Sequence, residues 1–152
     1  DALAGVAYDA CQALMVGFAA HPGWSPIRQK PDDVFDLILR DSSKPARPED
    51  AECWVAHASE AWSRPQLDID REDVADALLQ ELRARHGPLP EVRFVRAHRW
   101  RFSQVSVPLG RPFARSRDGT LVAGGDWALG RTAEEAFHSG RAMAHHVIDT
   151  LG

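Results

Sequence analysis

The sequence has 152 residues, of which 44% are hydrophobic and 26% charged, and it carries a formal net charge of −4 at pH 7. This length suits one domain, or somewhat more if the chain is a piece of a larger protein, and the composition is that of a globular protein with a packed core. The acidic balance argues against nucleic acid as a partner. No apolar run reaches the roughly 18 residues that would cross a membrane, so we expect no membrane partner either.

The two cysteines, Cys11 and Cys53, lie in apolar stretches and form no CxxC pair. This indicates buried thiols rather than a disulfide framework. The first residues lack the basic and apolar regions of a signal peptide, so we expect a cytoplasmic protein. Because the sequence opens without methionine, we expect a trimmed or partial product of a longer reading frame.

The first part of the chain predicts strands separated by loops. Residues 5–19 are apolar nearly throughout and fit both an amphipathic helix and a strand buried on both faces. Residues 20–33 and 41–50 are interrupted by prolines and are predicted to be loops. Short strands are predicted at Val34–Leu39 and Cys53–Ala58.

The clearest helix is predicted from Asp70 to His86. The Asp70 carboxylate is placed to cap the free amides of the first turn, and Gly87-Pro88 ends the helix. Its buried stripe consists of apolar residues four apart, namely Val74, Leu78 and Leu82.

A long strand is predicted from Glu91 to Val105. Because side chains alternate along a strand, its two faces differ in chemistry. One face is largely aromatic and carries Phe94, His98, Trp100 and Phe102; the other is basic and carries Arg93, Arg99 and Arg101.

The C-terminal segment predicts a turn at Asp118-Gly119, a short strand at Leu121–Ala123 and a helix from about Thr132 to Leu151. Thr132 and Glu135 have the spacing of a capping box. The helix has an apolar face made of Ala133, Ala136, Phe137, Gly140, Ala144, Val147 and Ile148. Strands outnumber helices without regular alternation, which favours an α+β fold.

The link between that last strand and helix has the residues of a ligand site. Two glycines let the backbone approach a ligand closely, and the Asp126 carboxylate that follows can accept hydrogen bonds from sugar or ribityl hydroxyls. The helix start then presents amides with partial positive charge. By pattern alone, an ordinary strand, turn and capped helix explains the same residues.

The run GGDW followed by AEEAFHSGRAMA resembles the closing signature of the flavin-containing amine oxidase superfamily, and of its renalase-like members in particular. Similar runs occur at Tyr8–Cys11, Ser42–Pro45, residues 53–59 and residues 98–105, so the resemblance spans nearly the whole chain in order. It also favours the strand over the helix for residues 5–19.

The resemblance implies an FAD cofactor and assigns residues to it. Gly125 and Asp126 match the glycine–acid pair that contacts the ribityl or pyrophosphate region, and Trp127 and Thr132 flank that contact. Ala133 matches the residue whose amide faces the flavin O2, and Glu134 follows it. Glu134 and Glu135 divide between a flavin-proximal and a capping role, in an order that the sequence leaves open.

The resemblance also implies the domain organisation. Residues 1–118 are expected to be part of a substrate-binding domain with a mostly antiparallel or mixed sheet and flanking helices. Residues 119–152 are expected to be the closing strand and helix of a Rossmann-type FAD domain. The GxGxxG unit that begins this family does not occur in the sequence, so we expect the N-terminal half of the FAD domain to come from a missing segment or a companion chain.

Three residues are candidates for catalysis. Trp100 has the size to flank a flavin or nicotinamide ring, although core packing explains it equally well. Arg101, with Arg99, is suited to phosphates, against the alternative of a solvated edge. His57 is a candidate acid–base group or a structural histidine, as is His98. The spacing of His138, His145 and His146 does not match a metal-binding pair, so no metal is expected.

The resemblance implies hydride transfer from a dihydronicotinamide-type substrate, or alternatively an amine, to FAD, with reoxidation by oxygen. Two other functions stay open: a non-catalytic binding or assembly module, and one subunit of a split flavoenzyme.

Overall fold

The structure is a computed structural model, and it describes residues 3–25, 32–48 and 50–151. It divides into two compact units. The sheet unit comprises Ala10–Arg101, and the terminal unit comprises Asp1–Asp9 with Phe102–Gly152. The long strands β1 (Ala7–Phe18) and β4 (Val92–Val107) run through both units. This division therefore differs from the 1–118 and 119–152 segments expected from the sequence, whose functional meaning stays a prediction.

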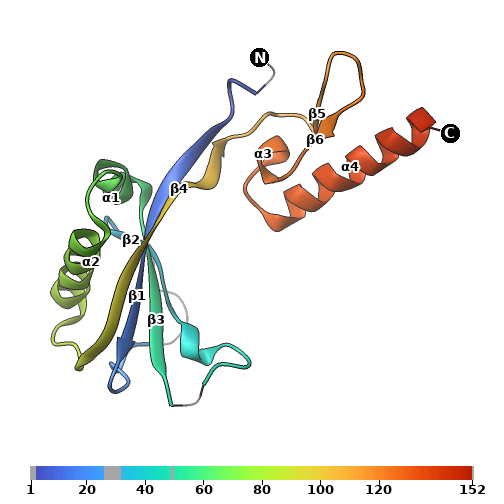
Figure 1. Cartoon of the computed structure of the whole chain (residues 1–152). Coiled ribbons are helices and arrows are strands. Elements are labelled where there is room, and N and C mark those ends of the chain that lie inside the picture. The colour runs from blue at the N-terminus through green and yellow to red at the C-terminus, as the bar shows by residue number, and fades with distance from the viewer. Residues whose placement is uncertain (1–2, 26–31, 49, 152) are drawn as a thin grey trace. The chain divides into compact units, whose positions relative to one another are not determined.

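The sheet unit is built on a four-stranded sheet in the order β2-β3-β1-β4 (Figure 1). β2 (Phe35–Arg40) and β1 both pair antiparallel with β3 (Glu52–Ala58). In this register His57 of β3 lies between Ala13 of β1 and Leu37 of β2. The α+β class and the antiparallel sheet with flanking helices are confirmed. Residues 7–18 of the apolar run at 5–19 form the strand β1, which resolves the ambiguity of the apolar pattern.

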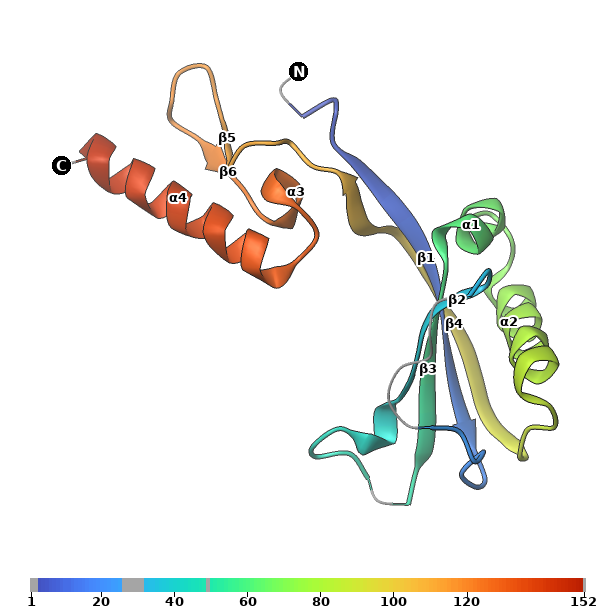
Figure 2. The same cartoon turned by 180° about the vertical axis from the view of Figure 1, so that it is seen from behind.

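Helices cover one face of this sheet. α1 (Glu60–Ser63), the 3₁₀ turn η2 (Arg64–Gln66) and α2 (Arg71–His86) follow β3, and Figures 1 and 2 show α1 and α2 on the same side of the strands. Alternate residues of β1 and β3 pack beneath α2. The core includes Leu14, Val16, Trp54, Ala56, Val74, Leu78 and Leu82.

The predicted ends of α2 are confirmed. The Asp70 side chain accepts a hydrogen bond of 2.8 Å from the Glu72 amide, which satisfies one free donor of the first turn. At the other end, Gly87 has φ 79°, a conformation that a residue with a Cβ adopts at a cost. The predicted stripe of Val74, Leu78 and Leu82 is fully buried.

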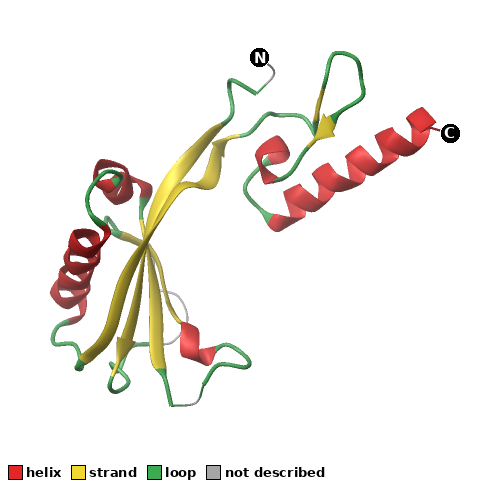
Figure 3. Ribbon diagram, in the orientation of Figure 1, coloured by secondary structure: helices red, strands yellow, loops and turns green. Residues whose placement is uncertain are grey.

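The terminal unit contains short elements and one long helix (Figure 3). β5 (Ala114–Arg115) and β6 (Val122–Ala123) pair antiparallel around the predicted Asp118-Gly119 turn, followed by α3 (Asp126–Leu129) and α4 (Ala133–Leu151). The sequence predicted neither β5 nor α3, because elements of two and four residues show no period. It also missed η1 (Asp41–Ser43), a 3₁₀ turn inside the predicted loop at 41–50, as well as α1 and η2.

α4 has an unexpected orientation for an amphipathic helix. Among the residues that the structure describes, Ser139 is its only buried residue. Most of the predicted apolar face is exposed, with Phe137 63% and Ile148 65% accessible, and Leu151 at the helix end 83%.

No helix within the described ranges is long and apolar enough to cross a bilayer. Residues 26–31, part of the predicted loop at 20–33, lie outside the described residues.

The core of the sheet unit generates a stability prediction. Leu78 is fully buried between α2 and the sheet, so Leu78→Ala removes apolar contacts and leaves a cavity. We expect a loss of about 2–5 kcal/mol in the free energy of unfolding, measured by urea denaturation. Ile69→Ala is the control, because Ile69 is 43% exposed in the same unit. Equal losses for the two variants would contradict this account of the core.

Candidate functional site

The candidate cofactor residues all lie in the terminal unit, around a tight contact between α4 and the two glycines that follow β6. The Ser139 hydroxyl is completely buried, accepts a hydrogen bond of 2.9 Å from the Gly125 amide and donates one of 2.5 Å to the Pro112 carbonyl. A Cβ on Gly124 would clash with the same hydroxyl. Gly124 is therefore required for the approach of the turn to the helix, and Ser139 fixes the position of the turn.

The start of α4 is a complete capping box, as predicted. The Glu135 carboxylate accepts hydrogen bonds from the Thr132 amide and hydroxyl, both at 2.9 Å, and the Glu135 amide donates to the Thr132 hydroxyl at 3.2 Å. Glu135 is therefore the capping carboxylate, and the open question between Glu134 and Glu135 is settled for this role. A side chain on Gly130 would clash with the Glu135 carboxylate, so glycine there makes room for the cap.

The capping box leaves two amides open. Within the described chain, neither the Ala133 nor the Glu134 N–H donates to a protein acceptor, and both residues are exposed. The Glu134 carboxylate lies 3.7 Å from the His138 imidazole one turn along the helix. The tip of α4 thus presents two adjacent donors at the positive end of a 19-residue helix. Both residues are exposed, so no side chain among the described residues covers this tip.

Asp126 begins α3, and one oxygen of its carboxylate accepts a hydrogen bond of 2.8 Å from the Trp127 amide. The Trp127 carbonyl in turn accepts from the Leu109 amide at 2.8 Å, and the Ala128 carbonyl accepts from Gly110 at 3.0 Å. These bonds hold the loop at 109–110 against α3. No donor among the described residues bonds to the second oxygen of Asp126, which is therefore available to a ligand.

An aromatic recess lies beside Asp126 in the same unit. Tyr8 and Phe102 meet edge to face with ring centroids 5.9 Å apart, and Leu3, Val6 and Trp127 complete a recess of about 490 Å³. Burial, and then the negative charge of Asp126, raise the pKa of the Tyr8 phenol above its ordinary value of 10.0. The sequence pattern places Tyr8 and Phe102 each on a strand but does not show which strand ends meet, so it did not predict this recess.

The three candidate catalytic residues all lie in the sheet unit. His57 lies opposite Ala13 on the sheet face that the helices leave uncovered, since its neighbours Ala56 and Ala58 face the core. Trp100 projects from β4 on that same face, 51% exposed, with its ring 4.4 Å from that of His98. β1 separates the strands that carry His57 and Trp100.

Arg101 is on the opposite face of β4, as the alternation predicted. Its guanidinium donates to the Leu67 carbonyl at 3.1 Å and to the Asp68 carboxylate at 2.8 Å, and Arg99 donates to the Ile69 carbonyl. The hydrogen bond and charge of Arg101 hold the pKa of Asp68 below its ordinary value. Both arginines thus bind the segment that leads into α2, and the structure does not bring Arg101 together with Trp100 and His57.

His57 is half-buried, and this burial lowers the pKa of its imidazole below 6.5. The positive charge of Lys44 lowers it further, while Asp36 opposes the shift. His57 is therefore neutral at pH 7 and able both to donate and to accept a hydrogen bond.

No protein-family model matches the chain.

Ser139→Ala is the first prediction from this site. The substitution removes the hydroxyl that joins the Gly125 amide to the Pro112 carbonyl, and we expect a loss of about 1–3 kcal/mol in the free energy of unfolding. Ser106→Ala on an exposed stretch of the same unit is the control and should change it little. Urea denaturation followed by tryptophan fluorescence measures both, and unchanged stability for Ser139→Ala would contradict the role assigned to this hydroxyl.

The second prediction concerns pH. Because the pKa of folded His57 lies below its unfolded value near 6.5, the unfolded chain takes up a proton first as the pH falls. Stability should therefore decline as the pH drops below about 6.5, and His86, whose pKa burial also lowers, adds to the decline. His57→Gln should reduce the difference in urea midpoint between about pH 7.5 and about pH 5.5. An unchanged difference would show that His57 does not contribute.

Proposed function

We propose that this chain supplies the C-terminal part of an FAD-dependent oxidoreductase of the renalase-like kind. The observation that supports the proposal best is the tip of α4, where the capping box engages the Thr132 and Glu135 amides and leaves those of Ala133 and Glu134 open and exposed. Two adjacent donors at a helix N-terminus suit an electron-rich oxygen of a bound ring. The sequence resemblance assigns the flavin to the same position.

The donor set in the terminal unit fits FAD. The Ala133 and Glu134 amides would face the electron-rich edge of the flavin, and the available oxygen of Asp126 would accept a hydrogen bond from a ribityl hydroxyl. Gly125, held by Ser139, would let the cofactor approach the backbone. When bound, FAD supplies the capacity to accept a hydride and to pass electrons to oxygen. Thr132 would support this site as the N-cap of α4, and Trp127 would support it as part of the recess beside Asp126.

The exposed stripe of α4 supports the expected Rossmann-type partner for this segment. Phe137, Ile148 and Leu151 are each more than 60% exposed on one helix. Large apolar side chains exposed on the same helix are often covered by another element. We propose that the glycine-rich half of an FAD domain covers them, supplied by a further segment or by a companion chain.

The open face of the sheet is the proposed substrate surface. The rings of His98 and Trp100 lie side by side at an interplanar angle of 59°, and the exposed indole of Trp100 offers its face to a planar ring such as a dihydronicotinamide. His57, neutral at pH 7, would exchange a hydrogen bond with an amide or amine of the substrate rather than abstract a proton. Arg101 is held by Asp68 and Leu67, so its proposed part is to position β4 against α2.

One backbone substitution tests the cofactor site. Ala133→Pro removes the N–H at the first position of α4, where proline is compatible with a helix. We expect FAD affinity in the natural-length protein to fall on the order of tenfold, because one hydrogen bond to an electron-rich oxygen is lost. Flavin fluorescence titration of the apoprotein measures this affinity.

Arg71→Pro is the matched control, because Arg71 is the first residue of α2 and follows a capped start in the sheet unit. It should leave FAD affinity unchanged. A natural-length protein that is colourless as purified and stays so after incubation with FAD would refute the proposal itself. Normal FAD binding by Ala133→Pro would refute only the role of the α4 tip.

The exposed stripe of α4 also favours a second candidate function, a subunit or assembly module without catalysis of its own. In that case the stripe would bind a partner chain, and the tip of α4 would be only a capped helix end. Co-purification of a partner that carries the glycine-rich unit indicates a split flavoenzyme. Co-purification of a partner without bound flavin indicates the assembly module.

A further inference from the structure

The outer edge of β4 is a second feature of the sheet unit with a chemistry of its own. Within the part of the chain that the structure describes, β4 is the last strand of the sheet and has a neighbour, β1, on one side only. Alternate residues of such an edge strand point backbone N–H and C=O groups away from the sheet. From Val92 to Arg101, these groups are available to another extended segment.

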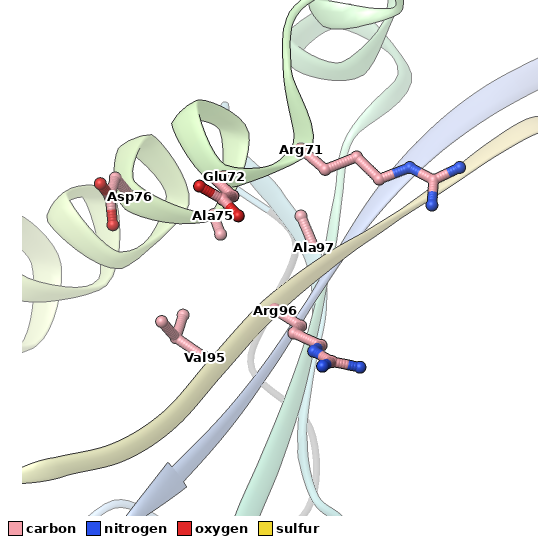
Figure 4. A pocket seen from close by; sticks show the side chains of 7 residues that line it. All are labelled: Arg71, Glu72, Ala75, Asp76, Val95, Arg96 and Ala97. Atoms are coloured by element: carbon pink, nitrogen blue, oxygen red, sulfur yellow. The ribbon is translucent and has the colours of Figure 1, made fainter.

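A groove runs along this edge, between β4 and α2. Its volume is about 560 Å³, and Arg71, Glu72, Ala75 and Asp76 line it from the helix. Val95, Arg96 and Ala97 line it from the strand. Figure 4 shows the Val95 and Ala97 side chains pointing toward α2, whereas Arg96 points away from it. The groove therefore joins a free strand edge to a small apolar floor, which is the geometry of strand addition beside a helix.

The charges around the groove discriminate between partners. Arg96 lies over the Phe94 ring at 5.7 Å and forms no ion pair with the described residues. Arg93 on the same strand also lacks a carboxylate partner in the described ranges, whereas Arg101 is paired with Asp68. A second copy of β4 would set these arginines against one another, which disfavours pairing between two copies of this edge.

We infer that the β4 edge binds an extended peptide segment by strand addition, and that the segment alternates small apolar with acidic side chains. The apolar side chains would pack on Ala75, Val95 and Ala97, and the acidic ones would lie on the opposite face, beside Arg96. Backbone hydrogen bonds hold the segment, and Arg96 selects its charge. This binding site does not depend on the flavin proposal.

Labelled synthetic peptides of about six residues with alternating valine and glutamate test the inference, with the full chain as receptor and fluorescence anisotropy as readout. N-methyl groups are placed on either the valine or the glutamate amides, which point to opposite edges of an extended peptide. One methylated isomer should bind about tenfold more weakly or worse, because it loses its bonds to β4, and the other should keep its affinity. Equal affinities for the two isomers would overturn strand addition.

Arg96→Glu tests the charge selection. It should weaken the valine–glutamate peptide about tenfold and strengthen a valine–lysine peptide. Arg115→Glu makes the same charge change at an exposed position of the terminal unit and should alter neither affinity. Circular dichroism confirms that both variants are folded. If sedimentation shows instead that the chain dimerises and that dimerisation competes with the peptide, the edge belongs to a second copy and the inference is wrong.

Discussion

Burial of alternate side chains beneath α2 is the constraint on which the sheet unit depends. Leu14 and Val16 on β1, and Trp54 and Ala56 on β3, point to the helix and supply the core. Because the period of a strand is two, this burial also decides what faces the other way. His57 on β3 and Trp100 on β4 lie on the uncovered face because the residues next to them point the other way. Ala56 and Ala58 pack in the core, and Arg99 and Arg101 bind the segment that precedes α2.

β4 shows how one strand serves two purposes through the same alternation. Arg99 and Arg101 reach the carbonyls of Ile69 and Leu67 and thereby fix the chain just before the cap of α2. Ala97 has a short side chain, which leaves room for the groove beside the helix. The residues between them, His98 and Trp100, are free to present rings on the opposite face. The packing of α2 and the aromatic surface are consequences of one sequence pattern.

Local patterns were enough to predict α2, the faces of β4 and the capping box at Thr132 and Glu135, because each depends on residues a few positions apart. The same patterns left residues 5–19 undecided, since an apolar run suits either secondary structure until its hydrogen-bonding partners are known. No local pattern predicted the recess of Tyr8, Phe102 and Trp127, because these residues lie far apart in the sequence and meet only in the folded chain. The α4 pattern identified an apolar face but not the direction in which it packs.

The packing of α4 follows from Ser139 rather than from its apolar stripe. The buried hydroxyl must meet both the Gly125 amide and the Pro112 carbonyl, and Gly124 has no side chain that would keep the helix away. Burying these polar groups costs free energy unless they bond to one another, so this contact fixes the rotation of the helix. The helix surface that bears Phe137, Ile148 and Leu151 then faces outward. The exposed stripe is thus a consequence of the polar contact at Ser139, and it is the surface that the proposed covering segment would bury.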